Sequence, residues 1–500
     1  MTAPGFSAGS ASDPLSSPTT PGGLGSVEME LRAQADRGVM RGRPGRGPGS
    51  GHRRVWLGLA TSMFVALAVS LAFSLLTPAW EANDEPEHVQ YIEYVMHTGR
   101  VPAISVANGW ESGQPPLYYY LAAEWQRLLD IPHFRVIPLP PALPTANPVH
   151  LLMRHDYTAA EREQAIWVHE LRLMSVLLAG VTVGACYLAT WLVSGRVSLA
   201  TGSALFAALL PKFGVVFGAV TNDTLVDALC GLALVAVLMW LRVGSGGVAR
   251  RLAWSVAVGL LLGCATLTKL TALPVAVFVF GLILLGTLRR RRRQWEPLTM
   301  LALAAAVSGW FYLRNYLVYG DFLAARANEK MVRHFFPGCL NISCYPLADL
   351  HHWLVGVPKG IVQTLWYVGG WNQLTLYPKV SYLLFLAAIL AVAAGAWLGR
   401  DLWAGPDGSL LRWSLSSMVM VVLGGLGAAY SVALAATQYQ GRYTFVGIGG
   451  ITGLITLGTW AVLRRLGVRH EWLAAMVWPV LMAGLLGAVT FVYVIPLRGL

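Results

Sequence analysis

Apolar runs, each about as long as a bilayer-crossing helix, alternate with polar connections along most of the chain. The first run extends from Val55 to Leu76 and contains no charged residue. Because about 20 apolar residues cross a bilayer as a helix, each run predicts a transmembrane helix. The fold class predicted is therefore an all-α polytopic membrane protein with about 11 transmembrane helices. The eleven predicted spans are 55–77, 171–193, 198–220, 224–242, 252–268, 270–288, 298–318, 380–399, 411–435, 444–463 and 472–495.

Two of the connections, 78–170 and 319–379, are too long to be simple turns. The first contains "NDEPEHVQYIEYVMHTG", in which apolar residues recur at helical spacing between Asp84 and Gly99. Asp84 has the position of an N-cap, with Glu87 three residues later in the capping-box position. A second amphipathic helix is predicted at "QPPLYYYLAAEWQRLLD", where the two prolines suit a first turn and the helix would lie in the membrane interface.

The distribution of Lys and Arg predicts the orientation of these helices. Lys and Arg number 37 against 25 Asp and Glu, a net charge of +12. The basic clusters fall in alternate loops, so the positive-inside rule places the N-terminus in the cytoplasm and 78–170 and 319–379 outside. Topology and the anionic head groups of membrane lipids thus explain the excess of positive charge, and we expect membrane lipids but no nucleic acid as partners. Residues 1–54, rich in Gly, Pro, Ser and Arg, are expected to form a disordered cytoplasmic tail, and 55–500 the transmembrane domain.

Cys339 and Cys344 lie in the second outer segment, within "PGCLNISCYP". Oxidising conditions outside the cell permit a disulfide between them, but the sequence leaves both the bridged and the free state open.

The segment "WEANDEPEHVQYIEYVMHTGRVP" carries five acidic residues directly after the first span. From the local pattern alone these carboxylates are as well explained by a capped helix with a solvated face. In that interpretation Glu87 caps the helix, while Glu81 and Glu93 lie on its wet side.

Polar residues at the predicted outer ends of other spans change this picture. Each one alone is readily accounted for as a helix cap or as a side chain reaching the interface. Together they surround the acidic motif with cations, and cations kept beside carboxylates at one membrane face favour a ligand that carries phosphate. These residues are Asn222, Asp223, Lys269, Arg314, Gln440, Arg442 and Tyr443.

Six motifs in this order resemble the lipid-carrier-dependent glycosyltransferases of the GT-C superfamily, among them protein O-mannosyltransferases and bacterial aminoarabinose transferases. The resemblance extends over about 55–495, and its most specific element is Asp-Glu after the first span with the "QPPLYY" helix behind it. The motifs are "NDEPEHVQYIEYVMHTGRVP", "ESGQPPLYYYLA", "LPKFGVVFGAVTNDTLVDAL", "LTKLTALP", "WFYLRNYLVYGD" and "QGRYTFVG".

The resemblance implies transfer of a sugar, hexose or pentose, from a polyprenyl-phosphate donor to a glycan, lipid or protein acceptor at the outer face of the plasma membrane. It places the catalytic base on Asp84, and Glu85 beside it stays open as the alternative catalytic carboxylate. A lipid phosphate leaves as a stable anion, so one base is sufficient and no second carboxylic acid is required. Candidate substrate- or phosphate-binding residues are His88, Gln114, Asn222, Asp223, Lys269, Arg314, Gln440, Arg442 and Tyr443.

No metal-ligand motif is present, although Asp84, Glu85, Glu111 and Asp223 are suited to a divalent cation if they lie close together. Two other classes of function stay open. A secondary transporter or flippase would use the same polar ring to bind its cargo, although no internal repeat is evident. An inactive relative serving as a scaffold is the third alternative.

Overall fold

The computed structural model describes residues 49–134, 159–243, 247–289, 295–335, 346–369, 374–400, 408–436 and 438–494. Contacts divide the chain into a unit Met1–Val55, of which only the beginning of helix α2 is described, and a unit Trp56–Leu500. The predicted tail lies largely outside the described residues, as does the Cys339–Cys344 disulfide.

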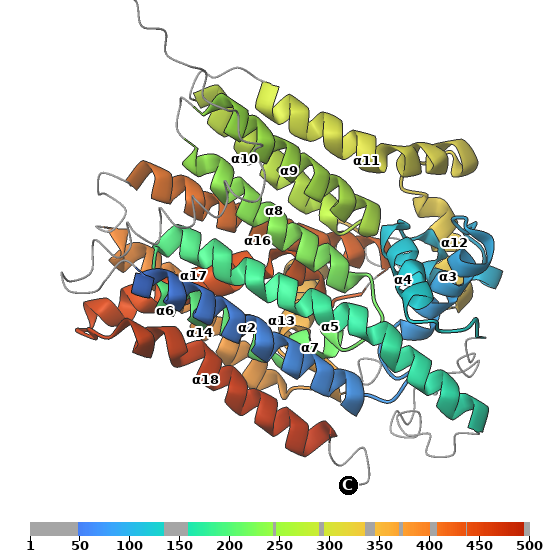
Figure 1. The fold of residues 1–500 in the computed structure, drawn as a ribbon, viewed down its shortest axis with the longest axis horizontal. Coiled ribbons are helices and arrows are strands. Elements are labelled where there is room, and N and C mark those ends of the chain that lie inside the picture. The colour runs from blue at the N-terminus through green and yellow to red at the C-terminus, as the bar shows by residue number, and fades with distance from the viewer. Residues whose placement is uncertain are drawn as a thin grey trace, which may run out of the picture. The chain divides into compact units, whose positions relative to one another are not determined.

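Long helices make up most of the described chain, as the apolar runs predict (Figure 1). Ten of them are long and apolar enough to cross a membrane, or eleven if one bent pair is counted as a span. The prediction of an all-α chain with about eleven spans is therefore confirmed for the described residues. The long helices are α2 (Gly49–Leu76), α5 (Ala159–Ser194), α8 (Asp223–Arg242), α9 (Val248–Thr268), α10 (Ala272–Arg289), α11 (Trp295–Tyr319), α14 (Pro378–Leu398), α16 (Gly408–Ala436), α17 (Ile448–Arg465) and α18 (Glu471–Val489).

The third predicted span is broken in the structure. It consists of α6 (Val197–Leu209) and α7 (Pro211–Phe217), which meet at an angle of 65°. Leu210 between them is extended, with φ −65° and ψ 117°. A residue before proline avoids the helical region, and Pro211 has no N–H to continue the ladder, so the bend lies where the sequence dictates.

Shorter elements lie between the spans. The segment after α2 forms α3 (Glu85–Thr98), the 3₁₀ turns η1 (Val106–Asn108) and η2 (Trp110–Gly113), and α4 (Leu117–Leu128). The segment after α11 forms α12 (Ala325–Phe335), the π turn η4 (His352–Gly356), α13 (Val357–Leu365) and strands β1 (Val368–Gly369) and β2 (Leu374–Thr375). The strands pair antiparallel, Val368 opposite Thr375. A 3₁₀ segment η5 (Gly441–Gly447) leads into α17, and a π segment η6 (Thr490–Val494) follows α18.

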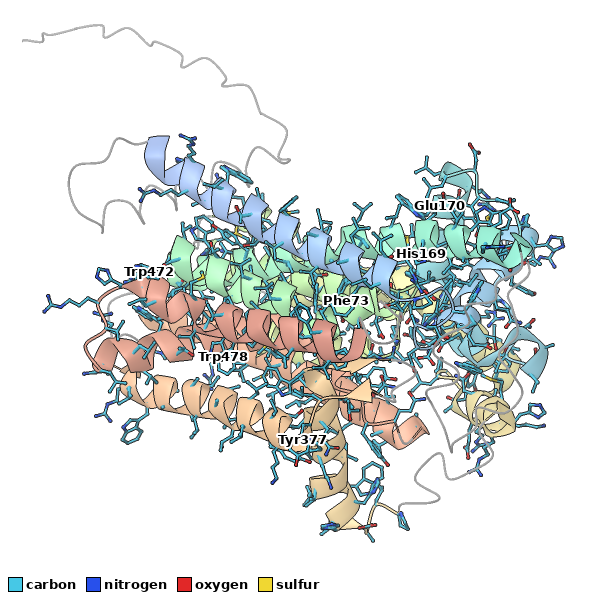
Figure 2. The ribbon with its side chains drawn as sticks, turned by 90° about the horizontal axis from the view of Figure 1, so that it is seen from below. Phe73, His169, Glu170, Tyr377, Trp472 and Trp478 are labelled. Atoms are coloured by element: carbon cyan, nitrogen blue, oxygen red, sulfur yellow. The ribbon has the colours of Figure 1, made fainter. Side chains whose placement is uncertain are left out.

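Helices α3 and α4 pack together and share a small core with α5 and the start of α8. Tyr118, Tyr119 and Ala122 of α4 face this core, whereas Leu121 and Leu128 stay exposed, as expected for a helix in the membrane interface. Figure 2 shows His169 and Glu170 of α5 at this end of the long helices, with Trp472 of α18 at the opposite end.

Some of the long helices approach so closely that only glycine fits between them. A Cβ on Gly458 of α17 would lie 2.3 Å from the carbonyl oxygen of Ala391 in α14. Membrane helices gain little from the hydrophobic effect against lipid, so close van der Waals packing of this kind contributes much of their association.

We expect Gly458→Ala to lower the unfolding temperature of the purified protein, because the added methyl group forces α14 and α17 apart. Overpacking of this kind costs about 1–3 kcal/mol. Gly484→Ala in α18 is the matched control, since a Cβ there meets nothing within 4 Å. The packing interpretation fails if the two variants unfold at the same temperature in one detergent.

Candidate active site

The ends of several spans converge on the beginning of α3. Hydrogen bonds and ion pairs join this region to α2, α5, the turn before α8, the α9–α10 turn and η5. These are the helix ends at which the sequence analysis predicted polar residues around the acidic motif. The structure therefore brings most of the predicted site residues together.

Glu85 is the most deeply held carboxylate of this region. Its side chain and that of Arg172 in α5 are both 0% exposed, with Arg172 Nε 2.7 Å from Oε1 and Nη2 2.6 Å from Oε2 of Glu85. The remaining donors of Arg172 bind the carbonyl oxygens of Ser74, Thr77 and Pro78. This two-pronged geometry is the strong form of an ion pair.

Two backbone N–H groups complete the shell of Glu85. Trp80 donates to Oε2 and Val220 donates to Oε1, each at 3.0 Å. Each oxygen thus accepts two hydrogen bonds, which leaves little capacity to take a proton from a substrate. The geometry gives Glu85 a structural part, in contrast to the catalytic part expected from the sequence.

Asp84, the neighbouring residue, is held differently. It occupies the N-cap position of α3 as predicted, but with φ 63° and ψ 1° its side chain makes no capping hydrogen bond. Asp and Asn are among the residues other than glycine that best tolerate this left-handed region. The carboxylate instead accepts hydrogen bonds at Oδ2 from Arg442 Nη2 and Asn83 Nδ2, both at 2.6 Å.

A buried chain of alternating charges extends from Asp84. Arg442 also lies 3.5 Å from Asp223 Oδ2, and Lys269 Nζ lies 2.6 Å from Asp223 Oδ1 and 2.8 Å from Asn222 Oδ1. The ring of Tyr443 is 5.2 Å from the Arg442 guanidinium carbon and 5.7 Å from Lys269 Nζ, within cation–π range.

A second, uncharged network adjoins this chain. His88 Nδ1 lies 2.9 Å from the hydroxyl of Tyr119, which donates to Glu111 Oε2 at 3.5 Å, and Asn222 donates to the same hydroxyl at 3.4 Å. Burial, followed by the charge of Lys269, lowers the pKa of His88 to about 3. Burial, followed by the charge of Asp84, raises the pKa of Glu111 to about 8. At neutral pH both groups are uncharged, so His88 cannot serve as a cation for phosphate.

Other predicted site residues lie at the edge of these networks or apart from them. Arg314 donates to the carbonyl oxygen of Pro102 and to Asn315, and so holds the first outer segment. Gln114 accepts a long hydrogen bond from Asn222 at 3.5 Å. Gln440 is buried at the N-cap of η5, and within the described chain its Oε1 has no hydrogen-bond partner.

The remaining acidic residues of the motif differ from the sequence interpretation. Glu87 accepts a hydrogen bond from the backbone N–H of Trp110 at 3.2 Å and so holds η2 in place. The sequence interpretation had instead made Glu87 the cap of the helix. Glu93 binds Gln126 at 2.6 Å and His133 at 2.9 Å, and Glu81 is half-buried, so neither lies on a wet face. Burial raises the pKa of Glu81 and that of Glu87 to about 7.

Three charged residues near the site were missed because they lie inside predicted spans: Arg172, Lys212 and Asp227. Lys212 is buried in α7, where its Nζ donates to the carbonyl oxygen of Val368 at 3.1 Å. Asp227 is buried one turn after Asp223 in α8. An ionisable residue within a membrane span marks a functional or structural site by default, and this signal could have identified all three.

The described residues contain no group of three or more His, Cys, Asp or Glu side chains arranged to hold a metal ion. Of the oxygen ligands considered from the sequence, Glu85 is paired with Arg172, and Asp84 and Asp223 are paired with Arg442.

No protein-family model and no curated protein matches the sequence. Among solved structures, the protein O-mannosyltransferase Pmt1-Pmt2 complex of S. cerevisiae bound to the sugar donor is similar at 14% identity and a TM-score of 0.36, over 57% of this chain and 34% of that chain. The chain thus spans about a third of the mannosyltransferase chain. ArnT from Cupriavidus metallidurans is similar at 17% identity and a TM-score of 0.35, both in the apo state and bound to undecaprenyl phosphate. The match covers 83% of this chain for the apo structure and 82% for the bound one, and 78% of ArnT in each case. These similarities are too distant to assign an activity.

We expect Glu85→Gln to destabilise the protein strongly, because it leaves the Arg172 guanidinium buried without its counter-charge. Breaking one side of a buried pair costs about 3–5 kcal/mol. The control is Glu124→Gln, which breaks an exposed ion pair with Arg127, so its effect should be at most about 1 kcal/mol. Thermal unfolding in detergent measures both; equal unfolding temperatures would contradict the structural part given to Glu85.

We also expect Glu111→Gln to flatten the pH dependence of stability. The folded-state pKa of about 8 exceeds the ordinary 4.5, so the stabilisation from Glu111 is lost as pH rises through about 8. His88 is present in both proteins, so its own contribution to the slope cancels in the comparison. Between pH 6.5 and 8 the free energy of unfolding of wild type should fall with rising pH more steeply than that of the variant, by up to about 1.4 kcal/mol per pH unit. Unfolding temperatures across this window test the expectation, which fails if the two slopes are parallel.

Proposed function

We propose that the protein is a membrane glycosyltransferase that moves a sugar from a polyprenyl-phosphate donor to an acceptor hydroxyl outside the plasma membrane, with Asp84 as general base. The proposed catalytic unit is 55–500, including the segments 78–170 and 319–379. The observation that carries the proposal is the contrast between two adjacent carboxylates, Glu85 with its shell of donors complete and Asp84 bound at one oxygen by Arg442.

Accessibility supports Asp84 as the base. Its side chain is 15% exposed, compared with 11% for Glu111, 4% for Asp223 and 0% for Glu85. Among the described residues no hydrogen bond is made to Asp84 Oδ1, so this oxygen can accept a proton while Oδ2 stays on Arg442. A left-handed backbone at a non-glycine residue costs free energy and is often kept at functional sites.

The transfer then proceeds in one displacement. The acceptor oxygen forms a bond with the anomeric carbon of the sugar, and its proton passes to Asp84 Oδ1. The bond between the anomeric carbon and the phosphate oxygen breaks, and its electron pair stays on the phosphate. Attack from the side opposite the leaving group inverts the configuration at the anomeric carbon.

The cations beside Asp84 suit the negative charge that develops on the leaving phosphate. Arg442 and Lys269 are fixed before any ligand binds, by Asp223, Asn222 and the ring of Tyr443. Fixed charges in a water-poor site stabilise a transition state without the cost of reorganising solvent. Lys212, whose Nζ is bound only to a backbone carbonyl among the described contacts, is the third hydrogen-bond donor that we assign to the phosphate.

We expect Asp84→Asn to reduce sugar transfer at least about 100-fold in proteoliposomes supplied with a polyprenyl-phosphate sugar, because the amide cannot take the proton. Asn also tolerates a left-handed backbone, so the fold should persist. Asp130→Asn is a matched control: this exposed aspartate also has a positive φ, 53°, and lies outside the charge chain. Its rate should equal that of wild type.

Two results would contradict the proposal. Transfer by Asp84→Asn at the wild-type rate would remove Asp84 as base. Passage of the intact donor across the bilayer, with no cleavage by wild type in the presence of a range of hydroxyl acceptors, would instead favour the transporter or flippase alternative.

A further inference from the structure

Helix α12 begins directly after the lipid-facing span α11 and has a firmly held N-terminus. Asp321 accepts hydrogen bonds from the backbone N–H of Leu323 at 3.0 Å and of Ala325 at 2.7 Å. Only 28% of the apolar window of α11 is buried within the protein, and Leu317, Phe322 and Leu323 at its end are exposed. The start of α12 is therefore placed at the boundary of the bilayer.

One face of α12 packs against the protein. Ala324 and Met331 are buried, and Asn328, between them on the same face, lies against Gly113 of η2. A Cβ on Gly113 would lie 1.8 Å from Asn328 Oδ1, so α12 rests directly on the turn that carries Glu111. Figure 1 shows α12 beside α3 and α4.

The opposite face of α12 is basic. Arg326, Lys330 and Arg333 are exposed and are spaced four and three residues apart, so they lie in one row along the helix. Glu329, the one acidic residue of the helix, forms an ion pair with Arg333 at 2.8 Å. We call Arg326, Lys330 and Arg333 the basic row; with Glu329 counted, two positive charges stay uncompensated on α12.

The place of this row is unusual for a membrane protein. α11 and α12 are joined to the first outer segment through Tyr319, whose hydroxyl accepts from the N–H of Ile104 at 2.9 Å, and through Arg314 and Asn328. The row therefore lies at the same end of the spans as Asp84. The sequence distribution of Lys and Arg otherwise favours the other end, so these cations need a separate reason.

We propose that the basic row binds the phosphate groups of anionic phospholipids at the membrane surface. Lys and Arg beside an anionic bilayer surface each contribute about 1 kcal/mol to binding, and the apolar residues just before the row hold it at headgroup level. Through Asn328 and Tyr319 the bound lipids would steady the turn that carries Glu111. This assignment does not depend on the proposed sugar transfer.

The test uses the full chain purified in a neutral detergent and titrated with phosphatidylglycerol, with bound lipid measured by native mass spectrometry. The triple variant Arg326→Gln, Lys330→Gln, Arg333→Gln should bind phosphatidylglycerol at least about tenfold more weakly. Each cation contributes about fivefold to the affinity, and the contribution of Arg333 is already offset by Glu329. The double variant Arg326→Gln, Lys330→Gln leaves the Arg333–Glu329 pair intact and should show most of the loss.

One control variant and one competitor test whether binding depends on the row itself. The charge-conserving variant Arg326→Lys, Lys330→Arg, Arg333→Lys should bind like wild type, because the number of cations in the row is unchanged. Unchanged binding by both Gln variants of the row would overturn the proposal. Displacement of phosphatidylglycerol by millimolar glycerol phosphate would also overturn it, because the row would then be a site for free phosphate.

Discussion

The buried pair of Glu85 and Arg172 is the interaction on which the site depends. A charge removed from water at the end of a membrane span is tolerated only with full compensation, and here every acceptor and donor is used. Arg172 binds carbonyl groups at the end of α2 that no longer have helical partners, while Glu85 binds N–H groups from the turns before α3 and α8. One ion pair thereby fixes four segments of the chain.

Asp84, whose backbone is in the left-handed region, precedes this locked Glu85 and makes no capping hydrogen bond to α3. It meets Arg442, more than 350 positions later in the sequence. The two adjacent carboxylates thus have different environments: both oxygens of Glu85 are fully hydrogen-bonded, whereas Oδ1 of Asp84 is available.

The sequence predicted the spans well, because crossing a bilayer imposes a length and a composition that few other structures share. It also predicted which helix ends carry the polar ring, and Asp84, Asn222, Asp223, Lys269, Arg442 and Tyr443 do meet there. It could not predict how the carboxylates are divided among partners, since pairing is a three-dimensional property. The pattern of a solvated helix misassigned Glu81, Glu87 and Glu93, because other segments pack against these side chains, and packing between segments cannot be inferred from one helix's own pattern.

The lengths of the contacts in the charge chain bear on how a phosphate would enter it. Arg442 is held at 2.6 Å by Asp84 but at only 3.5 Å by Asp223, while Asp223 keeps a 2.6 Å contact with Lys269. In the proposed reaction, the donor phosphate would take the Asp223 side of Arg442 without releasing Asp84, and Asp223 would stay compensated by Lys269. Asp84, as the proposed base, and Arg442 would then act as one unit, and exchange of a single long contact would admit the donor.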